Sequence, residues 1–131
     1  MMKLKGIELK GTYKVRFDDA WFEVYDDKGK AIYFENSNRD WIKREYDEKG
    51  NLVYYENSYG YWTEQEYNSK NKVIYYGDSE GYWFEKGYDE EGNEVYFEDS
   101  RGYVIDSRIK ELTVKEIENL LGYRIKIKRG E

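Results

Sequence analysis

Three tryptophans recur at intervals of twenty-one residues, and each is followed two or four residues later by a glutamate. The set consists of Trp41, Trp62 and Trp83 with Glu45, Glu64, Glu66 and Glu85. An indole face attracts cations, and a carboxylate beside it pairs with Lys or Arg. These residues could therefore bind a basic partner without covalent chemistry. There are two alternatives. The indoles could stack on sugar rings, or they could be buried as one stripe of the core.

The sequence offers little else that could perform chemistry. It has no His, which removes the commonest general base and zinc ligand, and no Cys, which removes disulfides and thiolate metal sites. Its acids recur at equivalent positions, whereas glycoside hydrolysis needs carboxyl groups in unlike environments. No glycine-rich phosphate loop leads into a helix. We therefore predict a protein that is not an enzyme and binds no cofactor or metal.

An internal repeat of twenty-one residues must position this set. One tyrosine series shows the spacing at Tyr25, Tyr46, Tyr67 and Tyr88, and a second shows it at Tyr33, Tyr54, Tyr75 and Tyr96. A serine series follows the same spacing at Ser37, Ser58, Ser79 and Ser100. A fixed period of this length indicates a repeat architecture, so we predict four repeats over residues 20–105.

Each repeat contains two turn signals of the form Asx-x-x-Gly, as at residues 47–50 and 57–60. The Asx side chain bonds the backbone of a type I turn, and Gly takes the left-handed position that closes a bulged hairpin. Asn71 replaces Gly in one copy and tolerates positive φ well. Arg39 replaces Gly in another copy and fits less well, so a different turn is expected there.

Segments of six or seven residues rich in Tyr, Trp, Val and Ile lie between the turns, such as 51–56 and 61–67. This is the length and chemistry of β-strands, and tight turns join only antiparallel neighbours. The prediction is a mainly β fold, an elongated and curved antiparallel β-hairpin array or meander. Alternation puts Trp62, Glu64 and Glu66 on one face. A stacked ladder of rings should form the core on one face, with a partly exposed mixture on the other.

The two ends depart from the repeat within what we predict to be one domain, 1–131. Residues 1–19 are predicted to form an N-terminal β cap. Residues 106–131 are predicted to form a helix–strand cap, since Thr113 and Glu116 make a capping box and Gly122 suits a helix C-cap. Tyr123, Ile125 and Ile127 then alternate with basic residues as a last strand would. The helix should hide the open edge of the array, with partner binding as the alternative.

Charge is distributed unevenly along the chain. Residues 19–106 contain 22 acidic and 10 basic residues, a balance of −12 within a net charge of −6. An acidic body repels nucleic acid and membrane surfaces and attracts a basic partner, so nucleic-acid binding is not expected. No apolar run approaches a membrane span, and the N-terminus does not resemble a signal peptide. A soluble, cytoplasmic protein without a membrane partner is the expectation.

The order Tyr-Asp-x-x-Gly-Asn-Leu at 46–52, followed by Gly60 and Tyr67, resembles the YD repeats of the Rhs and teneurin type. That resemblance covers about residues 20–105 and implies a β-hairpin spiral. The long arrays of the family enclose a cavity, and four copies are too few to do so. Segments 54–60 and 96–102 also resemble aromatic cell-wall-binding repeats, which hold choline or glucan between hairpins. Those repeats, however, open with a Gly-Trp pair that this chain lacks.

The predicted function is that of a non-catalytic binding protein whose acidic, aromatic repeat surface docks a protein partner with a basic surface. The use of Lys, Asn, Ile and Tyr is typical of AT-rich bacteria and their phages. We therefore expect a mobile-element inhibitor whose carboxylates stand where nucleic-acid phosphates would. A glycan or cell-wall binding module that uses stacked Trp and Tyr is the alternative. Self-association through sheet edges, which would give a homo-oligomer, is a third.

Overall fold

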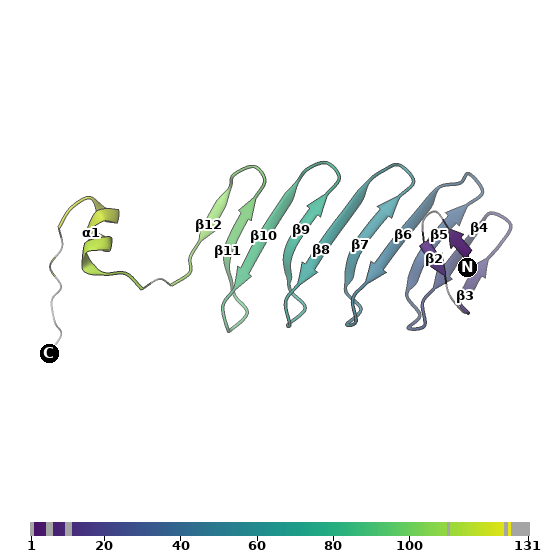
Figure 1. Cartoon of the computed structure of the whole chain (residues 1–131), viewed down its shortest axis with the longest axis horizontal. Coiled ribbons are helices and arrows are strands. Elements are labelled where there is room, and N and C mark those ends of the chain that lie inside the picture. The colour runs from purple at the N-terminus through teal and green to yellow at the C-terminus, as the bar shows by residue number, and fades with distance from the viewer. Residues whose placement is uncertain (1, 5–6, 10–11, 110, 125, 127–131) are drawn as a thin grey trace.

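The computed structural model describes residues 2–4, 7–9, 12–109, 111–124 and 126. In these residues, ten strands form one antiparallel sheet whose order follows the chain. The strands are β3 (Lys14–Phe17), β4 (Trp21–Tyr25), β5 (Ala31–Asn36), β6 (Trp41–Tyr46), β7 (Leu52–Asn57), β8 (Trp62–Tyr67), β9 (Val73–Asp78), β10 (Trp83–Tyr88), β11 (Glu94–Asp99) and β12 (Val104–Asp106). The predicted mainly β hairpin meander is confirmed (Figure 1).

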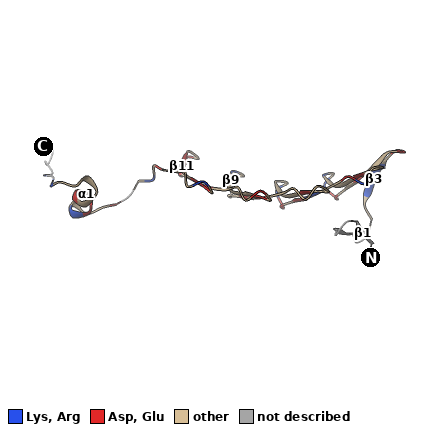
Figure 2. Ribbon diagram, turned by 90° about the horizontal axis from the view of Figure 1, so that it is seen from above, with Lys and Arg blue, Asp and Glu red and all other residues tan. Residues whose placement is uncertain are grey.

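The sheet is one layer thick. Seen from above, it runs as a thin, gently curved ribbon from β3 to β11 (Figure 2). Val24 and Tyr33 are the two apolar residues of the described chain that are fully buried. The ladder of rings exists, because Phe84 stacks on Tyr76 at 5.2 Å and on Phe97 at 5.8 Å between ring centres. These rings are only half-buried, so the predicted core is not enclosed.

The hairpin turns have the predicted geometry. In residues 57–61 the backbone N–H of Gly60 donates to the carbonyl of Asn57, with Gly60 at φ 86°. Asn71 takes the same left-handed conformation at φ 63°, as predicted. The expectation of a different turn at Arg39 is wrong, because Arg39 has φ 65° and donates to the carbonyl of Asn36 in the same way. The Asn36 side chain also accepts two backbone N–H groups of this turn, which helps to hold Arg39 in that conformation.

Two periodic contacts join neighbouring strands beyond the residue pairs that the sheet aligns. The N–H of Trp41 donates to the Ser58 hydroxyl at 3.1 Å, while the N–H of Ser58 donates to the Trp41 carbonyl at 2.9 Å. The same pair of bonds recurs between Trp62 and Ser79 and between Trp83 and Ser100. We call this pair of bonds the serine clamp.

The second contact uses the tyrosine that precedes each first turn. The hydroxyl of Tyr67 on β8 donates to the carbonyl of Leu52 on the neighbouring strand β7 at 2.7 Å. Tyr46 and Tyr88 donate to the equivalent carbonyls of Ala31 and Val73. The serine period of the sequence therefore reflects hydrogen bonds between β6 and β7 and their equivalents, and the tyrosine period reflects hydrogen bonds between β7 and β8 and their equivalents.

Both ends of the chain differ from the repeats. β1 (Met2–Leu4) and β2 (Ile7–Leu9) pair with each other in a separate two-stranded sheet, and β3 is the N-terminal strand of the main sheet. The helix α1 (Val114–Leu121) has the predicted capping box at Thr113 and a left-handed Gly122 at its C-terminus.

The predicted covering of the sheet edge by this helix is not seen. No residue of α1 is buried, and the helix lies beyond β12 (Figure 1). Tyr123, Arg124 and Lys126 are not in a strand, while Ile125 and Ile127 of the predicted last strand lie outside the described residues. α1 is too short and too polar to cross a bilayer, and it is the single helix of the described ranges.

We predict that Ser58→Ala destabilises the protein by about 1 kcal/mol, because the partly buried N–H of Trp41 loses its acceptor. Urea unfolding followed by circular dichroism measures the change. Ser69→Ala is the matched control, since Ser69 is an exposed turn serine outside the serine series. Equal stability of the two variants would show that the clamp contributes nothing.

Candidate functional site

All seven residues predicted for partner binding lie on one face of the sheet, which we call the acidic face. Alternation along β8 places Trp62, Glu64 and Glu66 on the same side. Residues directly opposite in an antiparallel pair share a face, so the register shows which residues of the neighbouring strands lie on the same side. It places Trp41 and Glu45 of β6 and Trp83 and Glu85 of β10 on the same side.

Tyrosines that were not among the predicted site residues lie between these glutamates. Tyr54 is paired with Glu45 on one neighbouring strand and with Glu64 on the other. Tyr75 is likewise paired with Glu66 and Glu85. The acidic face therefore alternates carboxylates with phenols along the sheet. The twenty-one-residue Tyr series was the signal that could have identified them.

The four glutamates predicted for the site are exposed. No Lys or Arg of the described ranges lies within 4.0 Å of their carboxylates, and Lys43 is paired instead with Glu56 at 3.5 Å. Glu85 lies directly opposite Glu98 on β11. Like charges in such positions repel and destabilise a sheet.

The three indoles occupy equivalent places on β6, β8 and β10, and each is half-buried. Lys43 Nζ lies 5.2 Å from the ring centre of Trp41. Within the described ranges, Trp62 and Trp83 have neither a stacked ring nor a cation over them. The indoles thus form a row without mutual ring contact, and each presents part of its surface to solvent.

Acids in the turns are held differently from acids on the face. Backbone N–H groups of Asn51, Lys49 and Gly50 and the Asn51 side chain bond Asp47 and lower the pKa of its carboxyl. Asp89 has the same surroundings and also a lowered pKa. These turn carboxylates fix the hairpin loops, whereas the exposed glutamates of the acidic face make no such bonds. Charge on the acidic face is therefore not required by the turns.

The phenols of the acidic face resist ionisation. Burial, a hydrogen bond to Glu56 and the charges of nearby glutamates raise the pKa of Tyr54 to about 12. Burial and the charges of three surrounding glutamates also raise the pKa of Tyr75. Both hydroxyls stay protonated at neutral pH. No group of acids in the described part of the chain has metal-binding geometry.

We predict a loss of stability at alkaline pH. A tyrosine whose folded pKa exceeds its usual 10.0 stabilises the fold fully below pH 10, and this contribution disappears as pH rises through about 12 for Tyr54. Tyr33 and Tyr76 shift in the same direction. Urea midpoints measured at pH 8, 10 and about 11.5 should fall after pH 10. Tyr54→Phe should reduce the fall, and an unchanged midpoint in the original chain would contradict the prediction.

Comparison with known proteins gives no family. No protein-family model and no curated protein matches the chain. A crystal structure of a GtfA/B complex bound to UDP and GlcNAc is similar over 90% of this chain, at 16% identity and a TM-score of 0.28. The match covers 28% of that structure's chain. So weak a likeness supports no conclusion about fold or function, and the resemblance to YD repeats stays a prediction.

Proposed function

We propose that this chain is a non-catalytic binding protein whose acidic face docks a protein partner with a basic surface. The observation that carries the proposal is the group of exposed glutamates that have no basic partner among the described residues and lie among phenols and indoles on one face. Carboxylates kept only for solubility need no common face. The opposition of Glu85 and Glu98 lowers stability, which is understandable if a cationic partner neutralises the pair.

The sheet gives this charge a regular spacing. Neighbouring strands lie about 4.8 Å apart and the site glutamates lie on every second strand, so their carboxylates form a stiff row with steps of about 10 Å. A row of this kind suits a basic groove that otherwise binds nucleic acid, since complementary charge steers association and selects partners. The partner we propose is a nucleic-acid-binding protein of the host, and the chain is then an inhibitor encoded by a mobile element.

The test compares two variants with equal loss of charge. Glu64→Gln, Glu66→Gln and Glu85→Gln together remove three of the four site charges of the acidic face, while Glu48→Gln, Glu80→Gln and Glu90→Gln neutralise exposed turn residues. A partner captured by the original chain from host lysate should carry a basic surface. Its Kd should rise at least about tenfold for the face variant and by a much smaller factor for the turn variant.

Salt separates this proposal from sugar binding. Docking through exposed charge weakens steeply as ionic strength rises, because the Debye length falls to about 8 Å at physiological salt and lower above it. Affinity that is independent of salt, lost in Trp62→Ala and directed at a glycan would replace the proposal with a sugar-binding function. Equal effects of the two triple variants would show that the acidic face is not the docking surface.

A further inference from the structure

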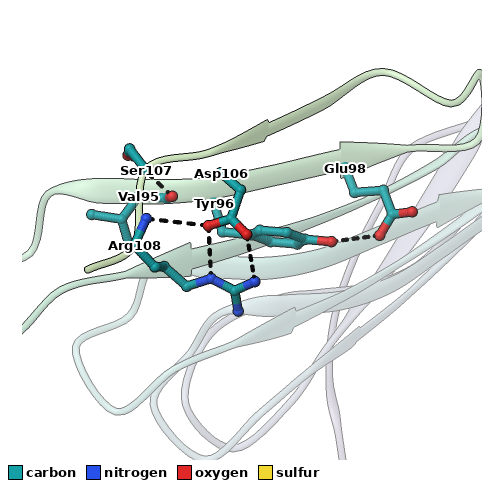
Figure 3. A network of polar contacts seen from close by, with 6 residues as sticks. All are labelled: Val95, Tyr96, Glu98, Asp106, Ser107 and Arg108. Atoms are coloured by element: carbon teal, nitrogen blue, oxygen red, sulfur yellow. Dashed lines mark hydrogen bonds and ion pairs between the residues drawn. The ribbon is translucent and has the colours of Figure 1, made fainter. Parts of the chain in front are cut away.

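The last repeat carries an arginine on the acidic face, and its surroundings are well defined. The guanidinium carbon of Arg108 lies 4.4 Å from the ring centre of Tyr96. Its Nε and Nη2 donate to the two carboxylate oxygens of Asp106 at 2.9 and 2.8 Å (Figure 3). Asp106 is the residue paired with Tyr96 across the strands. Arg108 is thus held by the ring face of Tyr96 and by two hydrogen bonds to the carboxylate of Asp106.

Neighbouring contacts fix this arrangement. The Tyr96 hydroxyl donates to Glu98 at 2.6 Å, and the Arg108 N–H donates to Asp106 at 3.1 Å. Ser107 donates its N–H and its hydroxyl to the Val95 carbonyl (Figure 3). The guanidinium therefore lies on a ring and a carboxylate that are already positioned by the sheet.

Two earlier repeats contain the same ring and carboxylate in the same register. Tyr54 is paired with Glu64, and Tyr75 is paired with Glu85, as Tyr96 is with Asp106. These pairs lie forty-two and twenty-one residues before the last one. We call them the two ring–carboxylate pairs. The first repeat differs, because Tyr33 is fully buried and Lys43 takes the place of the carboxylate.

The two ring–carboxylate pairs differ from the last repeat because neither has an arginine at the position of Arg108. The position of Arg108 is taken by Glu66 beside the Tyr54 pair and by Gly87 beside the Tyr75 pair. No Lys or Arg of the described ranges lies over the ring of Tyr54 or Tyr75. In the third repeat, Gly77 stands at the position that Glu98 occupies in the last repeat. The Tyr75 hydroxyl lies close to Gly77. Neither pair obtains a cation from the part of its own chain that the structure describes.

We infer that the two ring–carboxylate pairs each bind an arginine side chain of the protein partner, in the manner in which Tyr96 and Asp106 hold Arg108. This inference rests on the proposed function and specifies its partner. A planar guanidinium can stack on a ring and pair with both oxygens of a carboxylate at once, whereas the ammonium of lysine cannot. The pairs are two strands apart, so the two arginines should lie roughly 10 Å apart.

The experiment uses a hexa-arginine and a hexa-lysine peptide as probes, which have equal length and charge. We expect the arginine peptide to bind the original chain roughly tenfold more tightly by calorimetry, because each of two ring contacts adds about two- to fivefold. Upon binding, the ring signals of Tyr54 and Tyr75 should shift in NMR spectra, while those of Tyr103, an exposed ring in the last turn, should not.

Variants locate the preference. Tyr54→Leu with Tyr75→Leu should abolish the preference for arginine while leaving weak charge-driven binding of both peptides. Tyr54→Phe with Tyr75→Phe should retain the preference, because the rings remain, and circular dichroism establishes that both variants fold. Glu66→Arg with Gly87→Arg would place an arginine beside each pair, as in the last repeat. This variant should also lose the preference for the arginine peptide.

The outcomes separate the two proposals. Equal affinity for both peptides, lost when Glu64, Glu66 and Glu85 become Gln, would overturn the arginine inference and leave acidic docking intact. An arginine preference that persists in the folded Leu variant would also overturn the inference. Binding of neither peptide, or binding that is unchanged when these glutamates become Gln, would overturn both proposals.

Discussion

A sheet without a second layer cannot rely on an enclosed core, and this constraint governs the rest of the structure. β6 and β7 align five residue pairs, whereas β7 and β8 align three. The tyrosine hydroxyl bond reinforces the shorter β7–β8 junction, and the serine clamp extends the pairing of β6 with β7 beyond its last aligned pair. Each bond joins two residues at a fixed separation, seventeen residues for the clamp and fifteen for the tyrosine bond, so both require the same spacing in every copy. The strict twenty-one-residue period follows from this geometry.

Local chemistry made much of the fold predictable. Asx-x-x-Gly turns fix the register within each hairpin, and a strand period of two then assigns every residue between them to a face. The common face of Trp62, Glu64 and Glu66 followed from alternation alone. The left-handed conformation of Arg39 was not predictable from its residue type. Two backbone N–H groups of the turn donate to the Asn36 side chain, and these bonds hold the turn. Those bonds come from Asn36, the Asx residue of the turn, and not from Arg39 itself.

The candidate site was predictable in part, for a related reason. Tyr54 belongs to the acidic face through its pairing with Glu64, which lies on the next strand. A register shift such as the one between Glu45 and Tyr46 changes which residues of two strands share a face, so alternation along single strands does not show where Tyr54 lies relative to the glutamates. The net charge was equally uninformative about where the site lies, since Asp47 and Glu64 each contribute one negative charge to it. The structure separates them, because backbone N–H groups surround Asp47 while Glu64 is exposed.

Repetition and stiffness together explain how weak contacts could give a selective surface. An exposed ring and carboxylate contribute little to the binding of one cation, because water competes for both. Two such pairs held at fixed spacing act as one bivalent site, and a rigid sheet loses little conformational freedom on binding. A partner with two suitably spaced arginines would therefore be preferred over one with scattered lysines. Arg108 ends the series, since it supplies from the chain itself the cation that the earlier pairs would take from the partner.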